Sequence, residues 1–296
     1  MHWAIAMTPR KDTIFEQFLA PFFKTFLINS EEIKKYYESR NWEIESDRFR
    51  QPNFEYPKYY AQNFHGIENG YLNLGAAFSY DPITQHVLPP NELWVRQGLL
   101  DRIRCQPQRI LDLGCGTGST TRLLKQKFPN AAVIGIDLSP YMLAVADDKA
   151  RQAGLAIQFQ QGKAEQLTFA DGSFDLVTAS LLFHETPPAI SCKVLDEAFR
   201  LLKAGGEVLI LDGNQSTLRQ TEWLTQIFEE PYIRAYAQGS VDAWMGTAGF
   251  GDVRTESVWG VHQVSRGVKP LTHSSTERSV DLEADWASDT LIPQAI

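Results

Sequence analysis

The sequence has little cysteine, and its cysteines form no metal-binding pattern. Cys105, Cys115 and Cys192 are widely spaced among 296 residues, and an odd number of thiols cannot all pair within one chain. This usage is typical of a reducing compartment, so we expect a cytoplasmic protein with no metal site.

Long apolar runs and an excess of positive charge are also absent. No stretch of about 18 apolar residues occurs, and no signal segment opens the chain, so we expect neither a membrane-spanning helix nor secretion. The net charge of −8 disfavours broad binding to nucleic acid. The hydrophobic content of 43% is sufficient for a substantial core.

Two common phosphate-binding motifs are missing from the most distinctive stretch, residues 110–121. Gly114, Gly116 and Gly118 are spaced G-x-G-x-G rather than G-x-G-x-x-G, and no G-K-[ST] sequence follows. Asp112 precedes the turn, where its charge would repel phosphate and favour a cation. Glycines permit positive φ and leave the main chain bare, so this stretch predicts close contact between backbone and a small ligand.

Strand and helix patterns alternate from residue 109 onward, which predicts a mostly parallel sheet with helices on both faces. Ser139 as N-cap and Pro140 at the first helical position mark one of these helices. A closing hairpin brings an antiparallel strand to one edge. The seven expected strands are Arg109–Leu113, Ala132–Ile136, Ile157–Gln160, Phe174–Ala179, Glu207–Leu211, 251–258 and 260–266.

The patterns divide the chain into three regions. Residues 1–90 form a helical and irregular N-terminal extension, residues 91–268 form the main domain, and residues 269–296 form a flexible tail. The main domain opens with a helix expected over Asn91–Arg104. Its expected buried side holds Leu93, Trp94, Leu99, Leu100 and Ile103.

The N-terminal extension is rich in aromatic residues. Apolar pairs recur every four positions over residues 13–28, which predicts an amphipathic helix. This helix packs on the main domain, covers a substrate as a lid, or makes a weak membrane contact. Short helices are also expected at Glu31–Ser39 and Tyr59–Phe64.

Polar features follow three of the expected strands at their carboxyl ends, where open α/β sheets bind ligands. The glycine turn follows the first strand, Asp137 ends the second, and residues 162–165 (Gly-Lys-Ala-Glu) follow the third. A carboxylate in the position of Asp137 can accept hydrogen bonds from both hydroxyls of a ribose. These features predict a nucleoside-containing ligand.

The sequence resembles the class I S-adenosylmethionine-dependent methyltransferases. Four motifs occur in the order and spacing of that family: residues 111–118 (LDLGCGTG), 133–139 (VIGIDLS), 174–177 (FDLV) and 201–206 (LLKAGG). The resemblance covers roughly residues 92–268 and looks most like the branch that includes the ubiquinone and menaquinone C-methyltransferases. It implies a Rossmann-like fold and S-adenosylmethionine as the cofactor.

The resemblance also implies roles at the methionine end of the cofactor. Gly114, Cys115 and Gly116 would lie beneath this part, and Asp112 would help to hold its ammonium group. Ser180 would lie where the methionine end and the acceptor meet. The alternative for Asp112 is a capping role in the turn.

Other residues would hold the adenosine part. Asp137 would bind the ribose hydroxyls, and Leu138 would pack on adenine. Lys163 stands where many relatives have an Asp that accepts a hydrogen bond from the adenine amino group, which leaves Ala164 and Glu165 as candidates there. The alternative for Glu165 is an ordinary surface glutamate.

Methyl transfer from a sulfonium mainly requires alignment and a dry pocket, with a base only where the acceptor loses a proton. The segment after the fourth strand lies beside the transferring methyl group in this family. His184 is therefore the candidate base, with Glu185 as its candidate partner. The alternative is that His184 only bonds to nearby backbone.

The N-terminal extension and residues 214–248 are expected to close the acceptor pocket. Their aromatic residues favour a small apolar or aromatic acceptor: Tyr59, Tyr60, Tyr71, Tyr232, Tyr236 and Trp244. The alternative function is a non-catalytic protein that binds S-adenosylmethionine or acts as a scaffold. The intact glycine turn and Asp137 argue against that alternative.

Overall fold

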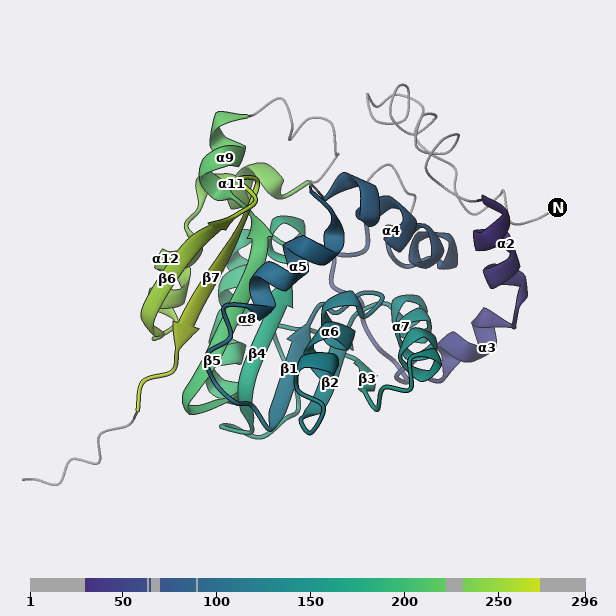
Figure 1. Cartoon of the computed structure of the whole chain (residues 1–296), viewed down its shortest axis with the longest axis horizontal. Helices are drawn as coiled ribbons and strands as arrows, with labels where there is room; N and C mark the ends of the chain where they lie inside the picture. The colour runs from purple at the N-terminus through teal and green to yellow at the C-terminus, as the bar shows by residue number, and fades with distance from the viewer. Residues whose placement is uncertain (1–29, 63, 65–69, 89, 222–230, 272–296) are drawn as a thin grey trace, which may run out of the picture.

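The computed structural model describes residues 30–62, 64, 70–88, 90–221 and 231–271 (Figure 1). The predicted helix over residues 13–28 and residues 272–296 of the predicted tail lie outside the described residues. Among the described helices, none combines the length and apolar character needed to cross a bilayer.

The described strands are β1 (Arg109–Leu113), β2 (Ala132–Asp137), β3 (Gln158–Gln161), β4 (Phe174–Ser180), β5 (Leu202–Gly213), β6 (Gly251–Val258) and β7 (His262–Val268). They form one seven-stranded sheet in the order β3-β2-β1-β4-β5-β7-β6. β7 is antiparallel to both of its neighbours, and the other pairs are parallel. The predicted sheet is confirmed, with the antiparallel strand one position in from the edge.

The chain reverses its direction of travel across the sheet between β1 and β4. β1 pairs with β2 on one side and with β4 on the other, and Leu113 lies opposite both Ile136 and Ala179. The carboxyl ends of these three strands therefore open at the same edge. The glycine turn that follows β1 lies at this switch point, where ligands bind in open α/β sheets.

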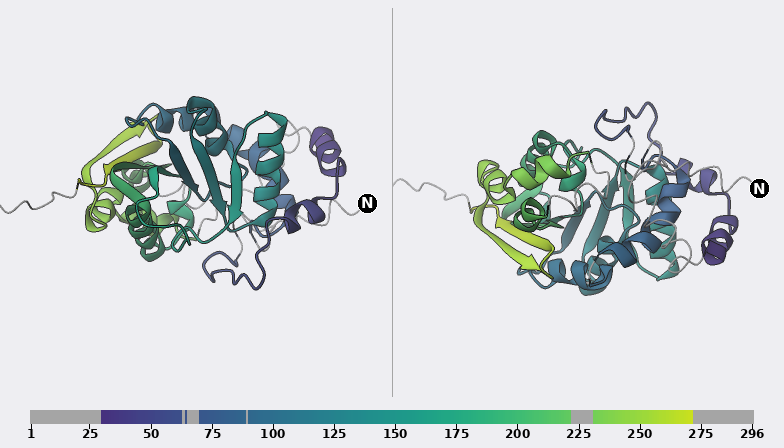
Figure 2. Two further views of the ribbon diagram at one scale, coloured as in Figure 1. Left: turned by 90° about the horizontal axis from the view of Figure 1, so that it is seen from below. Right: turned by 90° about the horizontal axis from the view of Figure 1, so that it is seen from above.

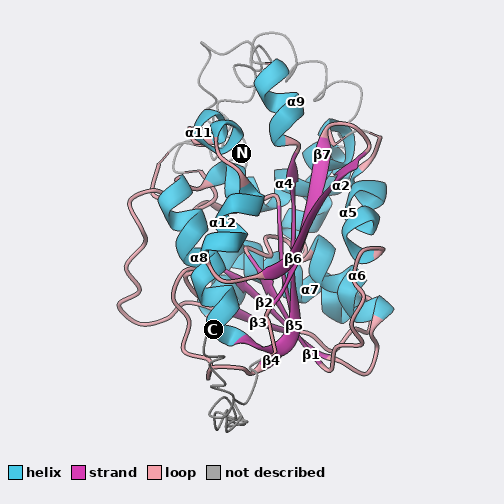
Figure 3. Ribbon diagram, turned by 90° about the vertical axis from the view of Figure 1, so that its left-hand side faces the viewer, coloured by secondary structure: helices cyan, strands magenta, loops and turns pink. Residues whose placement is uncertain are grey.

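Helices cover both faces of the sheet (Figure 3). Ser139 accepts a hydrogen bond from the Met142 N–H at 3.3 Å, which confirms the predicted start of the helix after β2. The described α-helices are α2 (Ser30–Glu38), α3 (Trp42–Asp47), α4 (Leu74–Val87), α5 (Glu92–Leu100), α6 (Ser119–Lys127), α7 (Pro140–Gln152), α8 (Pro188–Leu201), α9 (Gln215–Gln220), α11 (Ile233–Gln238) and α12 (Val241–Thr247).

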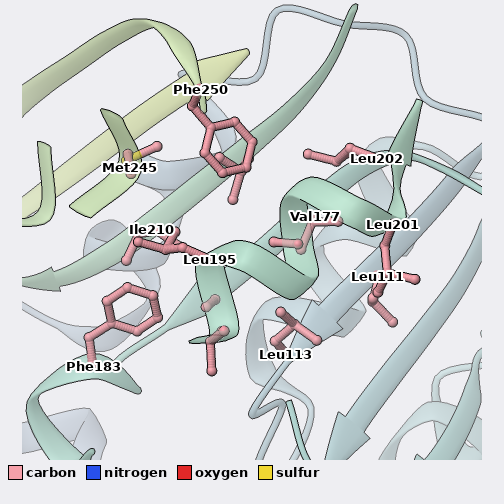
Figure 4. Close-up of a cluster of buried hydrophobic side chains, with 14 of the residues drawn as sticks. Leu111, Leu113, Val177, Phe183, Leu195, Leu201, Leu202, Ile210, Met245 and Phe250 are labelled. Atoms are coloured by element: carbon pink, nitrogen blue, oxygen red, sulfur yellow. The ribbon is translucent and has the colours of Figure 1, made fainter. Parts of the chain in front are cut away.

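Two apolar cores form because side chains alternate along each buried strand. On β1, Ile110 faces a core with Leu99 of α5, whereas Leu111 and Leu113 face a core with Leu195 of α8. Figure 4 shows the second core, and Figure 2 shows the helix layers on either side of the sheet. Burial on both faces explains the continuous apolar runs of the parallel strands.

The fifth strand begins earlier than its predicted start at Glu207, and residues 203–206 are part of it. α8 ends at Leu201, and β5 begins at the next residue. β5 pairs with β4 at Leu202 and again from Glu207 onward, so the intervening residues bulge out of the ladder. Gly205 has a φ of 81° in this bulge, a conformation that favours glycine.

Two sequence predictions are corrected by the structure. Residues 59–62 form turns and bends rather than a helix. On α5, Leu93 and Trp94 are more than half exposed rather than buried, and Trp94 stacks on the exposed Trp259 at the β6–β7 turn. Residues 214–248 contain three described helices, α9, α11 and α12.

The aromatic residues before β1 form a layer on α7. Trp42 and Phe78 pack with Met142 and neighbouring residues of that helix, and the two rings meet edge to face at 4.9 Å between centroids. Arg40 also pairs with the buried carboxylate of Asp148 on α7 at 2.5 Å. The N-terminal region is thereby fixed beside the carboxyl ends of β1 and β2.

Candidate functional site

A cavity opens at the carboxyl ends of β1, β2 and β4. It contains about 690 Å³ of empty space, part of which is open to solvent. The lining residues come from the glycine turn, from the segments after β2, β3 and β4, from α7 and α8, and from the N-terminal region. They are Tyr59, Tyr60, Tyr71, Tyr80, Gly114, Gly116, Ile136, Asp137, Leu138, Met142, Gly162, Ala164, Glu165, Leu181, Leu182, Glu185, Thr186, Ile190 and Val194.

The glycine turn presents bare backbone to this cavity. Gly114 and Gly116 have φ values of 63° and 51°, and both line the wall. A Cβ at Gly114 would lie 2.8 Å from Leu182, whereas a Cβ at Gly116 would meet no atom within 4 Å. Gly116 therefore borders open space. Cys115 is buried, and its Sγ packs beneath the turn, 2.9 Å from where a Cβ on Gly135 would lie.

Asp137 joins the turn to the end of β2. Its Oδ2 accepts a hydrogen bond from the Gly116 N–H at 2.8 Å, and its Oδ1 accepts one from the Ser139 N–H at 2.8 Å. Burial raises the pKa of Asp137 to about 6, although these backbone N–H groups favour the charged form. The carboxylate lines the cavity and retains acceptor capacity beyond its two backbone partners.

Asp112 and Ser180 are not among the cavity-lining residues. Asp112 is 1% exposed, and its two oxygens accept hydrogen bonds from Thr121 at 2.6 Å and from Thr178 at 2.7 Å. Burial raises the pKa of this carboxyl. Ser180 accepts a hydrogen bond from the Thr120 hydroxyl at 3.1 Å. The structure thus places both residues behind the wall, where they link β1, β4 and α6.

The segment after β3 supplies another carboxylate to the cavity. Leu138, Ala164 and Glu165 line it together, as the sequence motifs predict. Glu165 Oε1 accepts a hydrogen bond from the Tyr59 hydroxyl at 2.8 Å. Lys163 lies between these residues in sequence, but its ammonium group is 5.7 Å from the centre of the Phe54 ring and is absent from the cavity wall.

The segment after β4 places Glu185, rather than His184, in the wall. His184 Nδ1 lies 2.5 Å from Asp212 Oδ1, and its Nε2 lies 3.9 Å from Glu185 Oε1. Asp212, at the end of β5, is buried and also accepts a hydrogen bond from the Phe183 N–H. Sequence reasoning missed Asp212 as the partner of His184, although a carboxylate at a strand end was a visible signal.

Tyrosines of the N-terminal region close the cavity on one side. Tyr59, Tyr60 and Tyr71 line it as predicted, and Tyr80 was missed. Tyr71 donates a hydrogen bond from its hydroxyl to Glu185 Oε1 at 2.6 Å. The predicted contribution of residues 214–248 is not found among the described lining residues: Tyr236 is fully buried and donates to the Gly213 carbonyl at 2.7 Å.

The charged residues of the described cavity wall are all acidic. Asp137, Glu165 and Glu185 line the cavity, and the described lining residues include no lysine or arginine. Such a wall favours a ligand that carries positive charge and hydroxyl or amino donors. The remaining wall is aliphatic or aromatic, which suits an apolar group beside that charge.

The sequence of this chain is similar to those of known proteins. A family model described as a methyltransferase domain matches residues 110–206. A demethylmenaquinone methyltransferase of Thermus thermophilus is 40% identical over 119 residues, covering 40% of this chain and 53% of that protein. An uncharacterized methyltransferase of Synechocystis is 34% identical over 176 residues, covering 60% of this chain and 70% of that protein. The chain belongs to the class I S-adenosylmethionine-dependent methyltransferases.

The fold of this methyltransferase chain is also similar to a solved structure. An S-adenosylmethionine-dependent methyltransferase from Aquifex aeolicus has a TM-score of 0.51 and 19% identity, covering 67% of this chain and 98% of that chain. The predicted family and fold are thus confirmed. The chain spans about half the length of the demethylmenaquinone methyltransferases that it matches, and the roles of individual site residues stay predictions.

Replacement of Asp112 by Ala tests its position behind the cavity wall. The change leaves two buried threonine hydroxyls without their acceptor, so we expect a loss of about 2–4 kcal/mol in the free energy of unfolding. Urea denaturation measures this loss. Asp171→Ala is the matched control, because Asp171 pairs with Arg200 at the surface and should contribute little. Equal stability of the two variants would contradict the assigned role of Asp112.

Proposed function

We propose that this chain transfers a methyl group from S-adenosylmethionine to a small apolar or aromatic acceptor. The position of Asp137 carries this proposal. Its carboxylate lines the cavity beside the glycine turn, and each oxygen is oriented by one backbone N–H group. The remaining acceptor capacity suits the two hydroxyls of a ribose.

The residues of the cavity fit this cofactor. The open space beside Gly116 suits the methionine part against bare backbone. Leu138, Ala164 and Glu165 offer apolar surface and an acceptor for adenine. Cys115, Asp112 and Ser180, behind the wall, would act by holding the turn in place.

S-adenosylmethionine supplies a methyl group that is already activated by its sulfonium. The three carboxylates of the wall attract the positive charges of the sulfonium and ammonium groups. The protein then contributes mainly alignment and exclusion of water.

The other part of the cavity supports an apolar or aromatic acceptor. Leu182, Ile190 and Val194 line it on the side of β4 and α8, and tyrosines line it on the side of the N-terminal region. Relatives named demethylmenaquinone methyltransferases favour a ring of the naphthoquinol class. Such a ring would pack on this apolar surface, with its hydroxyls near Glu185.

Glu185 and His184 form a path for a proton released by such an acceptor. Glu185 lies at the wall and accepts a hydrogen bond from Tyr71. His184 lies behind it, held through Nδ1 by Asp212. This arrangement orients the Nε2 edge of the ring toward Glu185, so the pair can take up a proton that the acceptor loses.

Binding of S-adenosylhomocysteine, followed by calorimetry, tests the cofactor assignment. We expect Asp137→Asn to weaken binding by about 2–3 kcal/mol, or about 30- to 150-fold, because the ribose loses a charged acceptor and one of the Gly116 and Ser139 N–H groups loses its own. Asp171→Asn should bind as the parent does. If the parent shows no binding at millimolar ligand, the cofactor assignment is wrong.

The affinity for S-adenosylhomocysteine should also depend on pH. Because the pKa of Asp137 is about 6, its carboxylate is mostly protonated at about pH 5, and we expect binding about tenfold weaker there than at about pH 7.5. Unfolding does not explain this loss, since a raised carboxyl pKa adds stability as the pH falls towards the unfolded value. Asp137→Asn should lack the dependence, and a flat profile in the parent would contradict it.

Transfer of labelled methyl from S-adenosylmethionine to a short naphthohydroquinone tests the acceptor side. We expect His184→Gln and Glu185→Gln each to lower kcat by about 100-fold, because proton uptake is lost. His184→Gln should leave the S-adenosylhomocysteine affinity little changed, because His184 lies behind the cavity wall. Tyr141→Phe is the control, because the Tyr141 hydroxyl bonds to Glu43 at the surface and the residue is not part of the described wall. Undiminished transfer by both variants would exclude the proton path. Bound cofactor without transfer to any apolar ring, or transfer only to polar amines, would overturn the acceptor class.

A further inference from the structure

Two tryptophans form an exposed pair at the edge of the sheet where the cavity opens. Trp94 of α5 and Trp259 of the β6–β7 turn stack with 5.3 Å between ring centroids, and each is more than half exposed, as is Leu93. These three residues form the tryptophan patch. His262 at the start of β7 lies opposite Gly213 at the end of β5, so the turn before it projects from the carboxyl edge of the sheet. The patch therefore shares this edge with the cavity.

Trp259 is held in a backbone conformation that disfavours its side chain. Its φ is 52°, and the φ of Gly260 is 75°. Consecutive turn residues with positive φ favour Asn and Gly, and a bulky residue there is strained. The indole N–H donates to the Trp94 carbonyl at 3.3 Å, yet more than half of the residue stays exposed. Strain that yields so little burial points to a functional role for the ring.

The turn that carries Trp259 is anchored on both sides. The neighbouring Val258 is buried and packs against Gly98 of α5, where a Cβ would lie 2.7 Å from the valine Cγ1. Thr217 of α9 donates a hydrogen bond from its hydroxyl to the Gly260 carbonyl at 2.9 Å. The two indoles are thus held in one arrangement, which lowers the ordering cost of binding a partner.

The size and charge of the patch indicate what it contacts. Two half-exposed indoles and a leucine present on the order of 300 Å² of surface, well below the roughly 800 Å² that each partner contributes to a stable protein interface. Residues 93–95 and 257–261 contain no charged side chain, so the patch offers no ion pair to a charged partner. Tryptophan is favoured at the boundary between lipid headgroups and acyl chains, where its ring is buried and its N–H stays hydrated.

We propose that the tryptophan patch docks this chain on a lipid surface, with the carboxyl edge of the sheet toward the lipid. The choice of a lipid surface rests in part on the proposed function, because an apolar acceptor concentrates in lipid and the cavity opens at the same edge. The contact is peripheral, since none of the described helices can span a bilayer. The three apolar side chains enter the headgroup region and lose their contact with water.

Co-sedimentation with phosphatidylcholine vesicles tests the docking. We expect the parent to bind with little dependence on salt, because the patch makes no ion pairs. Trp259→Asn should weaken vesicle binding by about tenfold, because less apolar surface enters the lipid. Asn tolerates a positive φ, so the melting temperature of this variant should stay within about 2 °C of that of the parent.

Leu93→Ser and Ile44→Ser provide a matched pair of variants. Ile44 of α3 is 63% exposed and Leu93 is 56% exposed, but only Leu93 belongs to the patch. Leu93→Ser should weaken vesicle binding by about fivefold, whereas Ile44→Ser should bind as the parent does. Should Trp259→Asn fail to fold, the Leu93→Ser result decides.

Three results would overturn the docking proposal. They are a parent that does not bind the vesicles, parental binding by Trp259→Asn, and a dimer in sedimentation equilibrium that Trp259→Asn dissociates, which would assign the patch to a second copy of the chain. Vesicle binding requires neither cofactor nor acceptor, so its failure leaves the proposed function standing. Failure of the parent to bind S-adenosylhomocysteine would instead reject the proposed function.

Discussion

The carboxylate of Asp137 ties together the parts of the molecule that form the cavity. One oxygen holds the Gly116 N–H in the turn after β1, and the other holds the Ser139 N–H at the start of α7. Burial opposes the charge and raises the pKa to about 6, and the two N–H groups offset part of that cost. A side chain without two acceptor oxygens would release the turn or the helix start. The geometry of the switch point and the proposed site for ribose hydroxyls therefore depend on the same group.

The elements around this carboxylate were predictable because their signals are local. β1 was predicted with its observed bounds, and β2 differs by one residue, since both are short apolar runs that end at a polar turn. Ser139 and Pro140 mark the start of α7 through capping alone. The placement of Leu138, Ala164 and Glu165 in the wall follows from the topology, because the carboxyl ends of parallel strands meet at one edge.

The rest depends on contacts between residues that are far apart in the chain. Asp112 and Thr178 are 66 positions apart, and their hydrogen bond holds the buried carboxylate between β1 and β4. Trp94 fits the apolar face of a helix, yet it is half exposed and stacks on Trp259 of another element. The sequence paired His184 with its neighbour Glu185, whereas Asp212 at the end of β5 holds the ring. No local periodicity contains such information.

The N-terminal region contacts two carboxylates of the cavity wall through tyrosine hydroxyls. The Tyr59 hydroxyl donates a hydrogen bond to Glu165, and the Tyr71 hydroxyl donates one to Glu185. Both carboxylates are partly buried, and each phenol partly compensates the desolvation of its carboxylate without neutralising the charge. The negative charge of the wall is therefore retained where the N-terminal region packs against it.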